Sequence, residues 1–189
     1  MNLKRVLPFA KELLTNVIEA GDTVVDATTG NGHDTVFLAR LVGETGHVYG
    51  FDVQKEAIQA TTENLDKENL TKRTTLILDG HEHISKYVQT EVAAAIFNLG
   101  YLPGSDHEIV TRGTSTIKAI ESLLNLMKIG GLIVLVVYHG HEGGKEEKES
   151  LMHYVQQLPQ SYVHVLSYQF LNQQNNPPFI IALEKMKAK

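Results

Sequence analysis

The sequence predicts an α/β protein built on a doubly wound, seven-stranded sheet in which one strand runs antiparallel within a C-terminal hairpin. Aliphatic, β-branched runs alternate with longer helical patterns, as in parallel sheets that helices cover on both faces. The last two strand-like runs, residues 162–170 and 179–183, leave no room for a helix between them, so we expect them to pair antiparallel. A length of 189 residues suits a single domain spanning 1–189.

The individual elements follow from local periodicity. Residues 1–20 place Lys4, Arg5, Lys11 and Glu12 among apolar side chains, which indicates an amphipathic helix rather than the unbroken apolar centre of a signal peptide. Beyond it, short β-branched runs predict strands, and apolar residues three to four positions apart predict helices. In chain order we expect a strand at 23–27, a helix at 33–42, a strand at 47–51, a helix at 54–65, strands at 74–78 and 92–97, a helix at 114–127, a strand at 132–137 and a helix at 145–158.

Composition excludes several classes of protein. The chain has no cysteine, so disulfides, thiolate metal sites and cysteine nucleophiles are excluded, and a cytoplasmic location fits. No apolar run approaches the roughly 18 to 20 residues of a membrane span, so we expect no membrane partner. The net charge of −5 argues against binding nucleic acid through bulk electrostatics, although a local basic site for one small RNA element stays open.

The end of the first strand carries the strongest ligand-binding signal. Positions 26–34 read Asp-Ala-Thr-Thr-Gly-Asn-Gly-His-Asp. Doubly wound sheets bind ligands at the carboxyl ends of their strands, and glycine there lets the backbone turn sharply beside a ligand. A dinucleotide fingerprint would need glycine or alanine where Thr35 stands, so that match fails. The C-terminal hairpin and the polar turn instead favour S-adenosyl-L-methionine (AdoMet), which has no pyrophosphate.

Polar residues at the ends of consecutive strands fit the parts of AdoMet. Asp26 would hold the methionine ammonium directly or through water, and the turn around Asn31 would meet the carboxylate. Asp52 follows the glycine loop at the interval typical of an acid that binds ribose hydroxyls. The alternative is that these are turn and helix-cap residues. The expected cofactor-binding residues are Asp26, Thr28, Gly30, Asn31, Gly32, Asp34, Asp52, Gln54, Asp79, His81 and Asn98.

The segment after the fourth strand should cover the transferable methyl group. Positions 98–104 read Asn-Leu-Gly-Tyr-Leu-Pro-Gly. Asn98 can offer an amide oxygen to a substrate amine, and Tyr101 can stack on a planar base. The alternative is a purely structural turn, which Gly100 and Gly104 would favour.

Two further loops should converge on the same rim, at 138–144 and 172–179. The second contains Asn-Pro-Pro-Phe at 176–179, which imitates a signature of adenine amino-methyltransferases. We do not adopt that match, because in those enzymes the signature follows the fourth strand. His-Glu-His at 81–83 and His-Gly-His at 139–141 supply metal-ligand residue types, but their spacing does not match the usual helical pattern, and we expect no metal.

Together, the motifs at 26–34, 98–104, 138–144 and 175–179 make the chain resemble a small bacterial family long labelled rRNA methylase. Its better-defined members are tRNA 5-aminomethyl-(2-thio)uridine methyltransferases. The resemblance implies a Rossmann-like class I methyltransferase fold. It also implies methyl transfer from AdoMet to the aminomethyl group of wobble uridine 34, giving 5-methylaminomethyl-(2-thio)uridine, with the tRNA anticodon stem-loop as partner.

The resemblance also suggests which residues act on the substrate. Asn98 or Asp106 would orient the amine, and His107 or His139 would relay its proton. Ribosomal RNA, a small-molecule acceptor and a non-catalytic AdoMet- or RNA-binding module are the alternatives, and a homodimer is plausible. The expected catalytic residues are Asn98, Tyr101, Asp106 and His139, and the expected substrate-binding residues are Tyr101, Pro103, Gly104, Asp106, Arg112, Tyr138, His139 and Tyr168.

Overall fold

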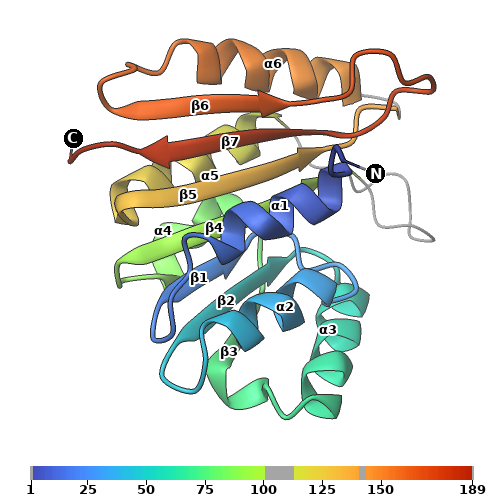
Figure 1. Cartoon of the computed structure of the whole chain (residues 1–189). Coiled ribbons are helices and arrows are strands. Elements are labelled where there is room, and N and C mark those ends of the chain that lie inside the picture. Colours follow the sequence, from blue (N-terminus) through green and yellow to red (C-terminus); the bar gives the residue numbers. More distant parts are fainter. Residues whose placement is uncertain (1, 101–112, 141–143, 189) are drawn as a thin grey trace.

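The computed structural model describes residues 2–100, 113–140 and 144–188. Its centre is a seven-stranded sheet in the order β3-β2-β1-β4-β5-β7-β6 (Figure 1). The pairs from β3 to β5 are all parallel, whereas β7 is antiparallel to both β5 and β6, which confirms the predicted sheet with one reversed strand. The strands are β1 (Thr23–Asp26), β2 (His47–Asp52), β3 (Thr74–Leu78), β4 (Val92–Leu99), β5 (Met127–Val137), β6 (Val163–Tyr168) and β7 (Phe179–Lys185).

Helices cover the sheet on both faces, so alternate side chains of the central strands point into two separate apolar layers. Val24 and Ile96 pack in the layer that includes α1, α2 and α3, and Val25 and Phe97 pack in the layer under α4, α5 and α6 (Figure 1). This two-sided burial explains the almost continuous aliphatic runs. The helices are α1 (Val6–Thr15), α2 (His33–Leu41), α3 (Lys55–Lys67), α4 (Ile84–Tyr87), α5 (Gly113–Leu126) and α6 (Gly144–Gln156), with short 3-10 helices η1 (Thr71–Arg73) and η2 (His81–His83).

The main difference from the predicted elements lies before the fifth strand, which we expected to begin at residue 132. Strand β5 begins at Met127, immediately after α5. Met127 pairs with Val92, but Leu132 already pairs with Ala94, so the intervening residues bulge out of the ladder. Gly130 adopts the left-handed conformation in that bulge, at φ +79°. Gly130 and Gly131 therefore belong to a bulge within β5.

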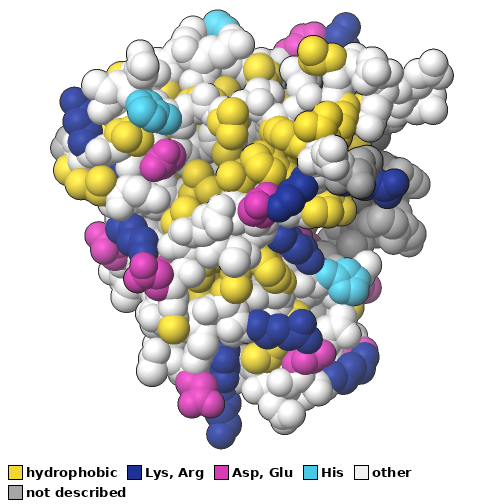
Figure 2. Space-filling model, in the orientation of Figure 1, with side chains coloured by type: hydrophobic (Ala, Val, Ile, Leu, Met, Phe, Trp, Pro, Cys, Tyr) yellow, Lys and Arg dark blue, Asp and Glu magenta, His cyan; other side chains and the backbone are white. Residues whose placement is uncertain are grey.

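The surface of the face that carries α1 mixes apolar and charged side chains. Figure 2 shows hydrophobic side chains gathered over this face and charges of both signs scattered around them. Leu7 on α1 and Leu166 on β6 are among the exposed hydrophobic residues. Within the ranges that the structure describes, no helix has the length and apolar character needed to cross a membrane.

The strand order reverses between β1 and β4, which are adjacent although β2 and β3 lie between them in sequence. Connections leave these two strands toward opposite sides of the sheet, and a crevice opens outside their carboxyl ends. In doubly wound sheets ligands bind in that crevice, so we expect a ligand site beside Asp26 and Leu99, where β1 and β4 end.

Candidate active site

A cavity of about 1040 Å³ lies at this reversal point. Its volume is at the upper end of the range typical of small-molecule and cofactor pockets. All of the predicted cofactor-binding residues except Asp26 and Gly32 line it, so residues far apart in sequence meet at one place. These lining residues are Thr28, Gly30, Asn31, Asp34, Asp52, Gln54, Asp79, His81 and Asn98.

The glycine turn forms one side of the cavity. Gly30 and Gly32 both have positive φ, at +50° and +80°, and the second of them precedes the first residue of α2. A Cβ on Gly32 would lie 2.8 Å from the Cα of Thr61 on α3. Gly32 therefore allows α2 and α3 to approach each other, and it does not line the cavity, although we expected it to bind the cofactor.

Asp52 at the end of β2 is fixed beside this turn. The backbone N–H of Gly30 donates to Oδ2 of Asp52 at 3.0 Å, and the N–H of Gln54 donates to Oδ1 at 3.0 Å. Each carboxylate oxygen has a second lone pair, so it can still accept a hydrogen bond from a vicinal diol. The glycine loop and Asp52, the acid that we expect to bind the ribose, are thus in direct contact.

Asp26 lies beneath the cavity floor and is fully buried. The Thr35 hydroxyl donates to Oδ2 of Asp26 at 2.6 Å, and the Thr28 N–H donates to Oδ1 at 3.2 Å. Burial, with added repulsion from Asp34, raises the pKa of Asp26 to about 7. Because both oxygens hold the turn from below, Asp26 organises the loop, and the direct ligand contact that we allowed for it is absent from this geometry.

A second acid, Asp79, also lines the cavity. Asp79 accepts hydrogen bonds from Nδ1 of His83, the hydroxyl of Tyr87 and the N–H of Gly80, each at 2.8 Å. These donors, the His83 bond above all, lower the pKa of Asp79 to about 2. Asp79 is therefore a carboxylate at neutral pH and can accept a further hydrogen bond from a ligand amine.

His81 presents a buried acceptor in the same wall. Its Nδ1 lies 3.1 Å from the carbonyl oxygen of Ala27, and since a carbonyl only accepts, Nδ1 carries the hydrogen. Burial lowers the pKa of His81, so the ring is neutral. Its buried Nε2 has no partner among the described residues, and the same holds for the hydroxyl of Thr29. Such unpaired atoms are costly unless a ligand or water satisfies them, so the wall fits a bound polar molecule.

Asn98 and Tyr138 line the cavity where β4 and β5 end. The backbone N–H of Asn98 donates to the Thr28 hydroxyl at 2.7 Å, and its side-chain Nδ2 donates to Oδ2 of Asp34 at 2.8 Å. The N–H of Tyr138 donates to the Leu99 carbonyl at 2.9 Å, which joins the ends of β4 and β5. Burial raises the pKa of Tyr138, with a contribution from Asp34.

The two loops expected to converge do come together in their described parts. The ring of His139 lies edge-on to that of Phe179, with centroids 5.7 Å apart. A Cβ on Gly140 would stand 3.6 Å from that of Asn176. Tyr101, Pro103, Gly104, Asp106, His107 and Arg112 lie outside the described residues, as do residues 141–143.

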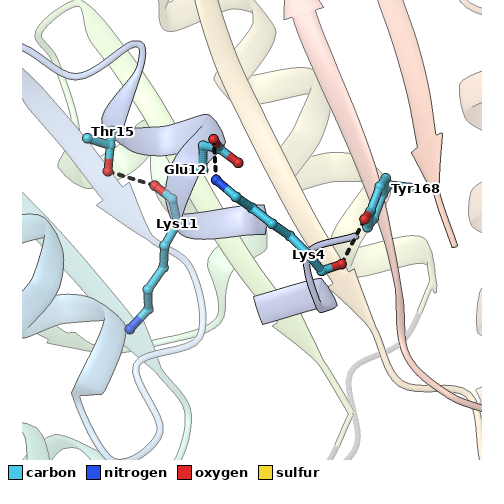
Figure 3. Close-up of polar contacts among 5 residues, drawn as sticks. All are labelled: Lys4, Lys11, Glu12, Thr15 and Tyr168. Atoms are coloured by element: carbon cyan, nitrogen blue, oxygen red, sulfur yellow. Dashed lines mark hydrogen bonds and ion pairs between the residues drawn. The ribbon is translucent and has the colours of Figure 1, made fainter. Parts of the chain in front are cut away.

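Tyr168 does not belong to the site. Its hydroxyl donates to the carbonyl oxygen of Lys4 at 2.7 Å, and its ring packs on Phe9 with centroids 4.1 Å apart (Figure 3). The ring and the hydroxyl both anchor the N-terminal segment, so this geometry gives no support to the predicted stacking on a substrate base. Sequence reasoning placed no part of α1 at the site, yet Leu7 and Lys11 line the cavity.

The described histidines of the two His-x-His motifs were the candidates for a metal site. In the part of the chain that the structure describes, no group of three or more His, Asp or Glu side chains is arranged to hold a metal ion. His81 and His83 lie on η2 and turn to different partners, Ala27 and Asp79.

The sheet order, the glycine turn joined to Asp52, and the polar cavity define a class I AdoMet-dependent methyltransferase. The chain belongs to the family described as "Putative rRNA methylase", whose sequence model matches residues 48–184. AdoMet is accordingly the cofactor of this enzyme.

Three relatives support this assignment over nearly the whole chain. A "tRNA (mnm(5)s(2)U34)-methyltransferase, chloroplastic" from Arabidopsis thaliana is 36% identical, with 96% of this chain and 70% of that protein covered. A crystal structure of a "putative rRNA-methylase" from Clostridium thermocellum is 45% identical, with a TM-score of 0.97 over 98% of this chain and all of that one. A "putative methyltransferase" from Streptococcus mutans, solved in complex with SAH, is 42% identical, with a TM-score of 0.90 over 97% of this chain and 99% of that one.

Proposed function

We propose that this enzyme methylates the 5-aminomethyl nitrogen of wobble uridine 34 in tRNA, giving 5-methylaminomethyl-(2-thio)uridine. The observation that carries the proposal is the amide of Asn98 in the cavity wall, because its oxygen suits an acceptor amine. Among the described residues, none donates a hydrogen bond to that oxygen. The named activity of the Arabidopsis relative supports the same substrate.

The cavity can hold the cofactor in one orientation. Asp52 would accept hydrogen bonds from the ribose hydroxyls, Asp79 and His81 would meet the adenine edge, and the turn at Asn31 would meet the methionine end. When bound, AdoMet supplies a methyl group already activated on a sulfonium, so the enzyme chiefly has to align the two reactants. The transferable group would then lie beneath Asn98 and Tyr138.

The acceptor amine must lose a proton before it can attack, since a primary amine is an ammonium ion in neutral water. A partly desolvated pocket lowers the pKa of that amine and raises its neutral fraction. The oxygen of Asn98 would then accept one remaining N–H and direct the nitrogen lone pair toward the methyl group. We include Tyr101, Asp106 and His139 as further catalytic groups in the proposal.

RNA binding would be local rather than general. The chain has a net charge of −5, and the face in Figure 2 mixes basic and acidic side chains, so no broad basic field attracts RNA there. Single-stranded loops are instead recognised by stacking and by a few directed contacts. Tyr138, 37% exposed at the cavity, offers a ring to a splayed base, and Arg112 would contact an anticodon-loop phosphate. A cytoplasmic reaction and a homodimer complete the proposal.

Ribosomal RNA is the second candidate substrate, because the family description names an rRNA methylase. Nucleoside mass spectrometry of tRNA and rRNA from a deletion strain separates the two. We expect 5-aminomethyl-uridine forms to accumulate in tRNA and to disappear when the gene is restored. Unchanged tRNA together with one missing methyl group in rRNA would favour the second candidate and contradict the first.

A further inference from the structure

Helix α1 forms part of the cavity wall, although it comes before the first strand. Its residues Leu7, Ala10 and Lys11 line the cavity. The helix is held from its other side by Tyr168, whose hydroxyl contacts the carbonyl of Lys4 (Figure 3). The position of α1 relative to the site is therefore fixed by the C-terminal hairpin.

Lys11 reaches from this helix into the site. Figure 3 shows its side chain extending away from the Lys4–Glu12 ion pair and from Tyr168. Its Nζ lies 3.6 Å from Oδ1 of Asp34 and 5.0 Å from the ring centroid of Phe37. The Asp34 side chain is 17% exposed and that of Lys11 is 42% exposed, so water screens this pair in part.

The other oxygen of Asp34 fixes the amide of Asn98. Oδ2 of Asp34 accepts from Nδ2 of Asn98 at 2.8 Å. A carboxylate accepts hydrogen bonds but has none to donate, so the amide must turn its NH₂ group to Asp34 and its oxygen away from it. The backbone of Asn98 is held separately by the Thr28 hydroxyl. The bond to Asp34 therefore restricts one remaining motion, the rotation of the side-chain amide.

We infer that Asp34 is a positioning residue for the acceptor amine, acting through Asn98, and that Lys11 supports it by holding the carboxylate in place. The inference rests on the proposed function, in which the Asn98 oxygen meets that amine. It also gives Asp34 a role different from the cofactor contact that the sequence suggested. If the amide rotated by half a turn, its NH₂ group would face the N–H groups of the amine, and two donors would oppose each other.

Kinetics and binding together test this role. In Asp34→Ala we expect kcat for methylation of tRNA bearing 5-aminomethyluridine to fall by about 10- to 100-fold, the loss typical of a hydrogen bond to a charged group. Affinity for SAH, measured by calorimetry, should change less than about threefold, because the cofactor does not depend on that contact. Asp34→Asn should recover part of the loss, since its own amide oxygen can accept from Asn98.

Lys11 has a matched control on the same segment. Lys11→Met should lower kcat by a few-fold, whereas Lys4→Met, which removes a surface ion pair with Glu12 away from the cavity, should leave kcat unchanged. Equal effects of the two lysine substitutions would remove the support assigned to Lys11. Retention of full kcat in Asp34→Ala, or a parallel fall in SAH affinity, would overturn the role of Asp34.

A readout without turnover keeps the inference separate from the proposed function. The side-chain amide signals of Asn98, identified by their loss in Asn98→Ala, should shift in Asp34→Ala and stay in place in Lys4→Met when followed by ¹H–¹⁵N NMR. Unshifted signals in Asp34→Ala would contradict the contact. A wild-type enzyme that left the tRNA unmethylated would contradict the proposed substrate, while the NMR result would still decide the orientation of the amide. Circular dichroism of each variant verifies that it is folded.

Discussion

Replacing Gly32 with alanine should destabilise the protein more than the same change at Gly130, although their φ angles are nearly equal. The two glycines have φ of +80° and +79°. A left-handed alanine costs roughly 1–2 kcal/mol at either position. At Gly130 the new Cβ would meet nothing within 4 Å, so that strain is the whole expected effect.

At Gly32 the new methyl group meets a second obstacle. It would lie 2.8 Å from the Cα of Thr61 and 3.0 Å from two of its side-chain atoms. Since a backbone atom cannot rotate away, α3 must move relative to α2, and overpacking of this kind costs about 1–3 kcal/mol more. The total for Gly32→Ala is therefore about 2–5 kcal/mol, against about 1–2 for Gly130→Ala.

Urea unfolding of both variants and the wild type at one pH measures these free energies. The denaturant slope should stay constant if the compactness of the unfolded state is unchanged. Equal losses in the two variants would refute the close approach of α2 and α3 as the reason for glycine at 32.

Three more predictions concern the charged groups of the site. The folded pKa of Asp26, about 7, lies above its unfolded value of 3.8, so the stability that its protonated form contributes is present below pH 3.8 and is lost as the pH rises toward 7. The unfolding free energy of Asp26→Asn should therefore rise relative to that of the wild type by roughly 2–3 kcal/mol between pH 5 and pH 7. A difference between the two proteins that does not change with pH would be inconsistent with the buried acid. Asp52→Ala should weaken SAH binding by about 10- to 100-fold in calorimetry, and Asp66→Ala on the exposed side of α3 should not; an unaltered affinity in the first would rule out the ribose contact. His83→Ala should raise the pKa of the Asp79 carboxyl from about 2 toward its ordinary value, as followed by ¹³C NMR; no shift would show that the histidine is not the main cause.

Strand-helix alternation was sufficient to predict the order of the elements and the C-terminal hairpin, because two-sided burial leaves a clear aliphatic pattern. The meeting of Gly30 and Asp52 was also predictable, since carboxyl ends of adjacent parallel strands share one edge of the sheet. Both predictions depend on backbone topology, which periodicity encodes.

The errors arose where a role depends on which way a side chain points. Asp26 and Asp52 both end strands, but Asp26 lies under the turn and Asp52 lies beside it. The one sequence feature that separates them is Thr35, whose hydroxyl donates a hydrogen bond to Asp26. Tyr168 seemed free to stack on a base, but its partner comes from Lys4 at the opposite end of the chain. Lys11 was read only as part of an amphipathic pattern. Such long-range contacts leave no local pattern.

The central claim is that this cavity transfers a methyl group from AdoMet to an aminomethyl nitrogen on wobble uridine. A single-turnover assay with purified enzyme, labelled AdoMet and an anticodon stem-loop carrying 5-aminomethyluridine tests it directly. We predict label in 5-methylaminomethyluridine alone, and no transfer to the same stem-loop with unmodified uridine. Equal labelling of both stem-loops, or none of either by an enzyme that binds SAH, would contradict the account.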